Sequence, residues 1–271
     1  MAHKYTNKLE GKSVLIVGGT SGIGFAVAEA SVEFGANVVV ASRSQERVDK
    51  TIKRLMESYP DAKGRIRGHV VNLHGDESET SIKRLFDFAT NENQDKIDHV
   101  VETAGEAPDA SLTLQDATPQ RITEASSSRF PGVVVLAKVA SKYLKKEYTS
   151  SFTITGGAAT YKPSQGWAVL AAIGGAKDAL ARGLAVDMAP VRVNLVSPGA
   201  TQTELMAFAF DNLNFGDLKA DPEVVRDMFR STSLLNRIGD PEDLAETYLS
   251  LMRNYFVTGT TLHVDGGKLL K

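Results

Sequence analysis

The sequence has no cysteine among its 271 residues. This absence excludes disulfides, thiolate catalysis and cysteine-ligated metal, and it is typical of proteins from a reducing compartment. A dominant charge sign is also missing, since 31 basic residues stand against 33 acidic ones without a long run of either. Nucleic acid and an anionic membrane are therefore not the expected partners, and a small-molecule substrate fits better.

Long hydrophobic runs are missing as well. Residues 1–12 are polar and charged rather than an apolar signal core, and no uninterrupted apolar stretch approaches the ~20 residues of a membrane span. The 5 histidines show no metal-ligand spacing, so no metal site is expected. These absences predict a cytoplasmic protein.

Short β-branched segments alternate along the chain with longer segments of helical apolar periodicity. Seven segments predict strands: 13–17, 36–41, 65–71, 97–101, 151–155, 191–196 and 260–264. Helical spacing between strands, as in 45–57, 78–89 and 166–188, indicates repeated βαβ units. We therefore expect an α/β fold, a Rossmann-type doubly wound sheet of seven parallel strands with helices on both faces.

No repeat, low-complexity tract or linker divides the chain, so residues 1–271 are expected to form a single domain. Residues 203–231 interrupt the alternation before the last strand. Ligands of open α/β sheets bind beyond the carboxyl ends of the strands, so this stretch could be a substrate lid. A plain surface excursion is the alternative.

A glycine cluster follows the first expected strand and leads into an expected helix over 25–34. The cluster comprises Gly18, Gly19, Thr20, Ser21, Gly22, Ile23 and Gly24. Glycines let the backbone approach a pyrophosphate, and the amino end of a helix offers unpaired N–H groups and a favourable dipole. A purely structural turn is the alternative, but the position between strand and helix predicts a dinucleotide site.

The second expected strand ends in Ser42, Arg43 and Ser44. An NAD-binding protein would carry an acid here to hold the ribose hydroxyls, whereas Arg43 would meet a 2′-phosphate. A solvated surface arginine is the alternative. We expect NADP(H) as the cofactor.

The glycine spacing at 18, 22 and 24 resembles the fingerprint of the short-chain dehydrogenase/reductase family, and further family landmarks follow in order as far as residues 258–267. The resemblance implies a nicotinamide cofactor and homodimers or homotetramers packed through helices that flank the active site. It also adds cofactor-binding positions: Asn72 near the adenine, then Ala104 and Gly105, and at the nicotinamide end Pro198, Gly199, Thr201 and Thr203.

In this family an Asn, a Ser, a Tyr and a Lys act together: Tyr exchanges the proton, Lys lowers the Tyr pKa and holds the nicotinamide ribose, and Ser fixes the substrate oxygen. The alignment keeps the lysine as Lys177 but puts Ile173, Gly157 and Arg129 at the Tyr, Ser and Asn positions. General acid help of this kind is worth roughly 10²- to 10⁴-fold, so plain ketone reduction should be slow. An iminium carbon needs no such donor.

Lys177, Arg129 and Trp167 are the expected catalytic residues. Lys177 and Arg129 would also contact the cofactor, although Arg129 could instead bind a substrate carbonyl or pair with Glu102. Trp167 could stack on a flat heteroaromatic substrate, with core packing or a subunit contact as the alternative. Candidate substitute proton donors are Tyr161, Ser164, Gln165 and Asp109.

The same pattern resembles a small group of fungal indole-alkaloid proteins, the NADPH-dependent reductase/Diels-Alderases of the paraherquamide and malbrancheamide type. This resemblance implies secondary metabolite biosynthesis in which an imine or iminium is reduced and a [4+2] cyclisation occurs in the same pocket. An acidic residue expected shortly before Trp167 is absent, since Ser164 and Gln165 stand there.

The leading hypothesis is therefore an NADPH-dependent oxidoreductase acting on an imine, iminium or similarly activated intermediate. Three alternatives stay open. They are a non-redox cyclase or isomerase that keeps NADP(H) as a structural cofactor, a catalytically silent NADP(H)-binding protein, and an ordinary ketone reductase with a substitute proton donor.

Overall fold

A computed structural model describes residues 4–207, 214–215, 218–219 and 221–271. Its main sheet has seven parallel strands in the order β3-β2-β1-β4-β5-β6-β9, as the alternating pattern predicts. The strands are β1 Ser13–Val17, β2 Asn37–Ser42, β3 Ile66–Val70, β4 His99–Glu102, β5 Ser151–Thr155, β6 Arg192–Pro198 and β9 Thr261–Val264. The first strand, β1, lies in the middle of the sheet. The strands β2 and β3 are added on one side of it and β4 onward on the other, and this change between β1 and β4 creates the crevice where such sheets bind ligands.

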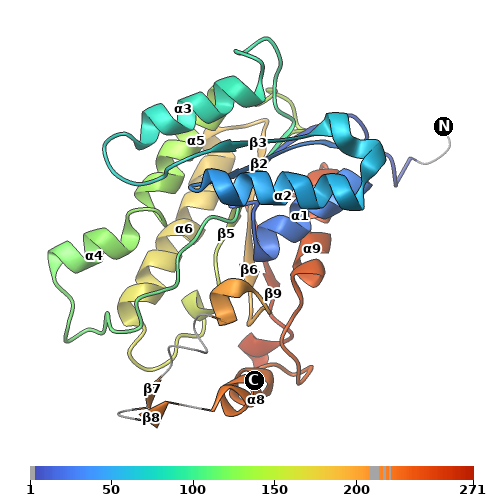
Figure 1. The fold of residues 1–271 in the computed structure, drawn as a ribbon. Helices are drawn as coiled ribbons and strands as arrows, with labels where there is room; N and C mark the ends of the chain where they lie inside the picture. The colour runs from blue at the N-terminus through green and yellow to red at the C-terminus, as the bar shows by residue number, and fades with distance from the viewer. Residues whose placement is uncertain (1–3, 208–213, 216–217, 220) are drawn as a thin grey trace.

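Helices cover both faces of the sheet (Figure 1). One face carries α1 Gly22–Glu33, α2 Gln45–Ser58 and α9 Pro241–Arg253, and the other carries α3 Ser78–Ala89, α5 Pro131–Tyr143 and α6 Ala168–Asp187. Burial from both sides explains why β1 and β2 consist almost wholly of apolar residues. The expected fold class is confirmed.

The remaining elements are short and lie in connections or near the carboxyl end of the chain. They are η1 Pro60–Arg65, α4 Pro119–Ser126, η2 Ala158–Thr160, β7 Asn214–Phe215, β8 Leu218–Lys219, α8 Pro222–Ser231 and η3 Lys268–Leu270. None of the residues of α4 is buried, and the helix projects from the body of the molecule (Figure 1).

The expected substrate lid, residues 203–231, is described only in parts. Residues 208–213, 216–217 and 220 lie outside the described residues. The antiparallel pair β7 and β8 was not expected from the sequence, because two-residue strands leave no periodicity to read. Thr203 at the start of the segment lines the crevice at the end of β1, so the segment begins where a lid would be attached.

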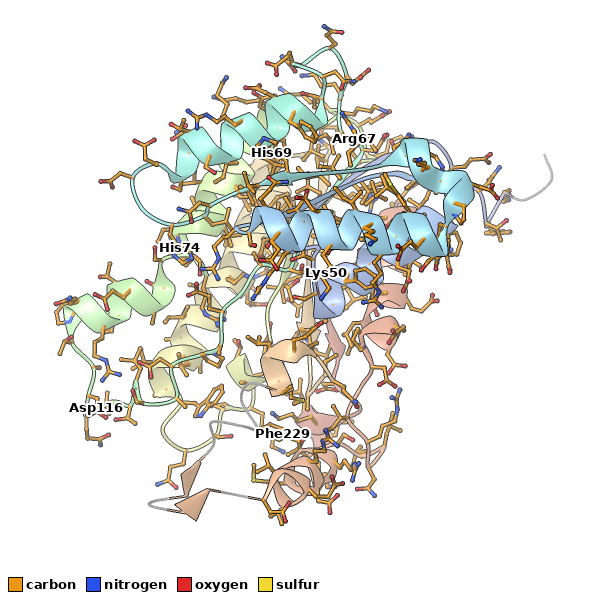
Figure 2. The ribbon with its side chains drawn as sticks, in the orientation of Figure 1. Lys50, Arg67, His69, His74, Asp116 and Phe229 are labelled. Carbon is orange, nitrogen blue, oxygen red and sulfur yellow. The ribbon has the colours of Figure 1, made fainter. Side chains whose placement is uncertain are left out.

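The edge strand β3 is covered by polar and aromatic contacts from the end of α3. Arg67 stacks on Phe88 and donates to the carbonyl of Ala89 at 2.9 Å. His69 lies against the same ring with 4.9 Å between ring centroids. Figure 2 shows Arg67 and His69 on the α3 side of the sheet. These contacts fasten the edge strand β3 to the end of α3.

The amino end of β4 holds a buried carboxylate. Asp98 accepts hydrogen bonds from Lys145 at 2.8 Å, Lys12 at 3.0 Å and the Ser13 N–H at 2.9 Å. Burial by itself would raise the Asp98 pKa, but Lys145, the Ser13 N–H and Lys12 together bring the pKa below its ordinary value. The group therefore ties β1 and β4 together at the end of the sheet opposite the crevice.

Replacing Asp98 with Asn should destabilise the fold by about 2–3 kcal/mol at neutral pH, because charge-assisted hydrogen bonds are lost. Because the Asp98 pKa is lower in the folded protein than its ordinary value of 3.8, the ionised carboxylate stabilises the fold fully above that value. This stabilisation is lost as pH falls through the folded-state pKa. The difference between wild type and Asp98→Asn should therefore be constant between pH 5 and 8 and shrink below it. Urea unfolding at pH 7, 5 and 3 measures this difference; an equal loss at pH 3 would contradict the assignment.

Candidate cofactor and reaction site

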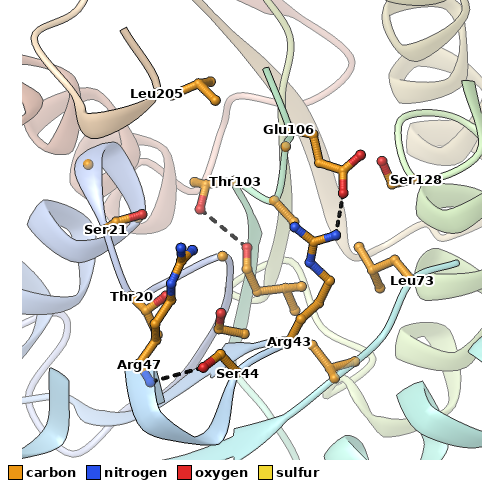
Figure 3. A pocket seen from close by; sticks show the side chains of 18 of the residues that line it. Thr20, Ser21, Arg43, Ser44, Arg47, Leu73, Thr103, Glu106, Ser128 and Leu205 are labelled. Carbon is orange, nitrogen blue, oxygen red and sulfur yellow. Dashed lines mark hydrogen bonds and ion pairs between the residues drawn. The ribbon is translucent and has the colours of Figure 1, made fainter. Parts of the chain in front are cut away.

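A cavity of 570 Å³ opens beyond the carboxyl ends of β1, β2 and β4 (Figure 3). It contains twelve of the residues expected to bind cofactor: Gly18, Thr20, Ser21, Gly22, Ile23, Gly24, Ser42, Arg43, Ser44, Ala104, Gly105 and Thr203. Residues from both sides of the point where the chain reverses direction thus meet in one crevice.

The glycine loop is packed so closely that side chains would not fit. A Cβ on Gly18 would lie 2.6 Å from the backbone nitrogen of Ala104, and one on Gly24 would lie 2.2 Å from the carbonyl oxygen of Gly18. Gly22 has φ of +48°, and a Cβ there would meet Thr203 at 2.8 Å. These glycines therefore keep open a cradle lined by backbone.

The amino end of α1 supplies the donors of this cradle. Ser21 is the N-cap residue, and its side chain makes no capping hydrogen bond in the described part of the chain. The N–H groups of the first turn, around Gly22 and Ile23, are therefore left to an anion, which the helix dipole also favours. The cradle fits the pyrophosphate of a dinucleotide.

Two arginines stand at the end of β2. Arg43 forms an ion pair with Glu106, and His74 approaches the same carboxylate with its Nε2 at 3.6 Å. The guanidinium of Arg47, in the first turn of α2, lines the cavity and has no ion-pair partner among the described residues (Figure 3). Arg47 was not expected from the sequence, although its place four residues after Arg43 could have indicated a second cation for a phosphate.

Asn72 does not line the cavity, although its neighbours Val71 and Leu73 do. Its side chain instead fixes the following turn, because Oδ1 accepts from the backbone N–H of His74 at 3.1 Å and Nδ2 donates to the carbonyl of the same residue at 3.2 Å. The expected contact of Asn72 with the adenine stays a prediction.

The segment after β6 is locked to the rest of the sheet. The Gly199 N–H donates to Val264 at 2.9 Å, and a Cβ on Gly199 would lie 2.7 Å from the Asp265 backbone. Thr201 is buried and forms a bridge with Gly239. Pro198, Gly199 and Thr201 lie outside the 570 Å³ cavity. Their contact with the nicotinamide end stays a prediction.

Lys177 lies outside the 570 Å³ cavity and forms a buried ion pair that the sequence did not reveal. Its Nζ lies 2.7 Å from Oε2 of Glu102, and the two side chains are 8% and 0% exposed. Glu102 ends β4 and Lys177 lies on α6, so the pair joins sheet and helix. The other carboxylate oxygen, Oε1, has no partner among the described residues.

Arg129 does not form an ion pair with Glu102 or line the cavity, although the neighbouring Ser128 does. It donates to the backbone carbonyl of Glu106, which fixes its guanidinium between the ends of β4 and α5. Burial lowers the Arg129 pKa, and the charges of Glu102 and Glu106 partly offset this. Glu102, the alternative partner expected for Arg129, is paired with Lys177 instead, and the expected contact of Arg129 with cofactor or substrate stays a prediction.

The positions that hold Tyr and Ser in the resembled family carry no polar side chain in this protein. Ile173 is only 7% exposed and forms part of the apolar face of α6 one turn before Lys177. A Cβ on Gly157 would meet nothing within 4 Å, so open space takes the place of a hydroxyl. Neither position offers a proton.

The candidate substitute donors are engaged elsewhere or exposed. The Tyr161 hydroxyl donates to Asp178, and burial, then this carboxylate, raise the Tyr161 pKa. Asp109 is ion-paired with Arg121 at 2.7 Å. Ser164 and Gln165 are both exposed on the loop before α6. In this arrangement no candidate donor is held beside Lys177.

Trp167 is the N-cap residue of α6 and is half-buried. Its backbone N–H donates to the carbonyl of Ser164 at 3.1 Å, which closes the loop that precedes the helix. The expected stacking of its ring on a substrate stays a prediction.

Among the described residues no cluster of His, Asp and Glu could hold a metal ion, and none of the helices has the length and apolar character of a membrane span.

Comparison with known proteins gives matches over nearly the whole chain. The sequence profile of the family described as "SDR-like rossmann domain" matches residues 5–271. The short-chain dehydrogenase/reductase ucsE of an Acremonium species is 40% identical, with 100% of both chains covered.

Two solved structures are also similar. MalC reductase/Diels-Alderase from Malbranchea aurantiaca has a TM-score of 0.87 and 34% identity, with 98% of this chain and 100% of that chain covered. A short chain dehydrogenase from Burkholderia cenocepacia in complex with NADP has a TM-score of 0.78 and 25% identity, with 97% and 99% covered. The fold around the crevice is thus shared with these proteins.

Replacing Glu106 with Gln should tighten the binding of 2′,5′-ADP, which carries the 2′-phosphate expected to meet Arg43. The change frees Arg43 and removes a negative charge from the cavity. Because the Arg43 and Glu106 side chains are 56% and 46% exposed, the gain should not exceed about fivefold. Calorimetric titration measures this change, with Glu79→Gln as a matched control because Glu79 pairs with Lys138 at 2.7 Å on α3 and α5. Unchanged or weaker binding would mean that Glu106 does not compete for the phosphate-binding arginine.

Proposed function

Since this chain belongs to the short-chain dehydrogenase/reductase family, we propose that it is an NADPH-dependent reductase of an imine, iminium or similarly activated intermediate. The single observation that carries the proposal is the replacement of the proton-donating side chains. Ile173 and Gly157 stand where the family's Tyr and Ser would be, and Tyr161 donates to Asp178. The proposed chemistry therefore uses no hydroxyl acid at the family's Tyr and Ser positions.

The choice of NADP(H) rests on the end of β2. Arg43 and Arg47 both line the cavity, and Ser42 and Ser44 flank Arg43 with hydroxyl groups. A 2′-phosphate is recognised by this combination of guanidinium and hydroxyl donors, whereas a free ribose diol is recognised by a carboxylate. The NADP complex of the Burkholderia cenocepacia relative supports the same cofactor.

Bound NADPH would supply a hydride, and the protein would hold and orient the reacting groups. Hydride addition to a ketone produces an alkoxide that must be protonated, whereas addition to an iminium carbon produces a neutral amine. Lys177 would hold the cofactor ribose, Arg129 would bind an electron-rich group of the substrate, and Trp167 would stack on a flat ring. We thus propose Lys177, Arg129 and Trp167 as the catalytic residues.

A cyclisation in the same pocket is a second candidate. It is favoured by the likeness to MalC reductase/Diels-Alderase, and by an open space at Gly157 that leaves room for a bulky intermediate. We propose on the same basis a role in fungal secondary metabolism, where a coupled [4+2] step would follow reduction. Cytoplasmic location and a homodimer or homotetramer belong to the same proposal.

A matched pair of bicyclic substrates tests the proposal. N-methyl-3,4-dihydroisoquinolinium carries an iminium carbon and 1-tetralone carries a ketone on a frame of nearly the same shape. Single-turnover loss of the NADPH absorbance band, corrected for the reaction without protein, should be at least roughly 10² times faster with the iminium. Ketone reduction at an equal rate would overturn the proposal. Product formation without loss of NADPH would instead support a non-redox cyclase, and the binding of NADPH without turnover of either substrate would support a silent binding protein.

Replacing Tyr161 with Phe tests the remaining route to ketone reduction. Because the Tyr161 hydroxyl donates to Asp178 rather than projecting beside Lys177, the iminium rate should change by less than about twofold. Thermal unfolding of the variant serves as the control for loop packing. A fall of the ketone rate to the background without protein would identify Tyr161 as the proton donor.

A further inference from the structure

The buried pair of Glu102 and Lys177 holds more hydrogen-bonding capacity than the protein itself uses. One N–H of the Lys177 ammonium donates to Oε2 of Glu102 at 2.7 Å, and its other donors have no partner among the described residues. On the carboxylate, Oε1 is buried and likewise without a partner. Buried donors are expensive when they stay unpaired, so the free N–H groups of Lys177 call for a partner.

The backbone under the pair is rigidly held. The Thr155 hydroxyl donates to the carbonyl oxygen of Glu102 at 2.5 Å and lies 2.6 Å from the hydroxyl of Tyr248, which is fully buried on α9. Glu102 itself is 0% exposed. Oε2 of this carboxylate accepts from the Thr155 N–H on β5 at 3.5 Å and from the Lys177 ammonium on α6 at 2.7 Å, so the strand and the carboxylate together fix where the ammonium lies.

The expected course of the dinucleotide along the cavity would bring its nicotinamide half close to Glu102 and Lys177. Arg43 at the end of β2 would hold the adenosine phosphate, and the amino end of α1 after β1 would hold the pyrophosphate. The next strands in the sheet are β4 and β5, so the nicotinamide half would extend over the position where Glu102 ends β4. Thr103 to Glu106, which follow Glu102 directly, already line the cavity.

We propose that Glu102 is the positioning residue of the nicotinamide half: it holds Lys177 as an oriented ammonium whose free N–H groups receive the ribose diol. The inference rests on the proposed cofactor. Glu102 acts through Lys177, because its side chain is 0% exposed and its Oε2 lies 2.7 Å from the ammonium. With Ile173 in the place of a tyrosine, this carboxylate is the acidic side chain against which the ammonium is held.

Two ligands separate this role from a general effect on folding. NADPH carries both halves of the dinucleotide, whereas 2′,5′-ADP carries only the adenosine half. In calorimetric titrations of the full chain, Glu102→Gln should weaken NADPH binding by roughly tenfold or more, because one partner of a buried charge pair is lost. Binding of 2′,5′-ADP should change by less than about twofold, since its site is distant from the pair.

Asp98→Asn is the matched control, because it neutralises a second buried, lysine-paired carboxylate at the opposite end of the sheet beside β4. It should lower the unfolding temperature and leave the ratio of the two affinities unchanged. Equal weakening of both ligands by Glu102→Gln, or the same NADPH-selective loss in Asp98→Asn, would overturn the positioning role.

A double variant keeps the inference testable if Glu102→Gln folds poorly. Glu102→Gln with Lys177→Gln removes both charges and leaves no single buried ion. If Glu102 acts only through Lys177, the double variant should bind NADPH no more weakly than Lys177→Gln alone; an additive loss would contradict this. Wild-type protein that binds neither NADPH nor 2′,5′-ADP would refute the proposed cofactor itself, which is a distinct outcome from the failure of the positioning role.

Discussion

The close approach of backbone at the carboxyl end of β1 is the constraint on which the site depends. Gly18 and Gly24 bring the start of α1, the end of β1 and the residues after β4 within van der Waals contact, with no room for a Cβ at either position. The same approach exposes the amino end of α1 to the crevice and sets the line along which a dinucleotide can lie. In the proposed binding mode, the arginines after β2 and the pair of Glu102 at the end of β4 with Lys177 on α6 would lie toward opposite ends of that line.

Two ion pairs of different burial lie in and beside the crevice, while Arg47 lines the cavity without an ion-pair partner among the described residues. Arg43 pairs with Glu106 at the outer end, where both side chains are about half exposed and the interaction is weak. Lys177 pairs with Glu102 at the inner end, where both are buried and the loss of one partner leaves an unpaired buried charge. We propose that the outer pair opens for a phosphate, whereas the inner pair stays buried in the framework.

The fold could be predicted from the sequence because strands that are buried on both faces of a sheet contain runs of apolar residues. The strands at 13–17 and 151–155 have the predicted bounds. The glycine cradle could also be predicted, because all its glycines lie within one short stretch between a strand and a helix. The pair of Glu102 and Lys177 was not predicted, since 75 residues separate its members and only the tertiary fold brings their side chains together. Arg47 and Glu106 were missed for a related reason: a surface charge shows its role only when the cavity beside it is known.

We propose that a nicotinamide cofactor reacts here without a hydroxyl acid, and a crystal structure of the complex with NADPH would decide the question. We expect Lys177 at the ribose hydroxyls and, over the reacting nicotinamide carbon, Arg129 and apolar side chains only. A hydroxyl or carboxylic acid within about 3.2 Å of the space where a substrate oxygen would lie, such as Tyr161 turned away from Asp178, would contradict it.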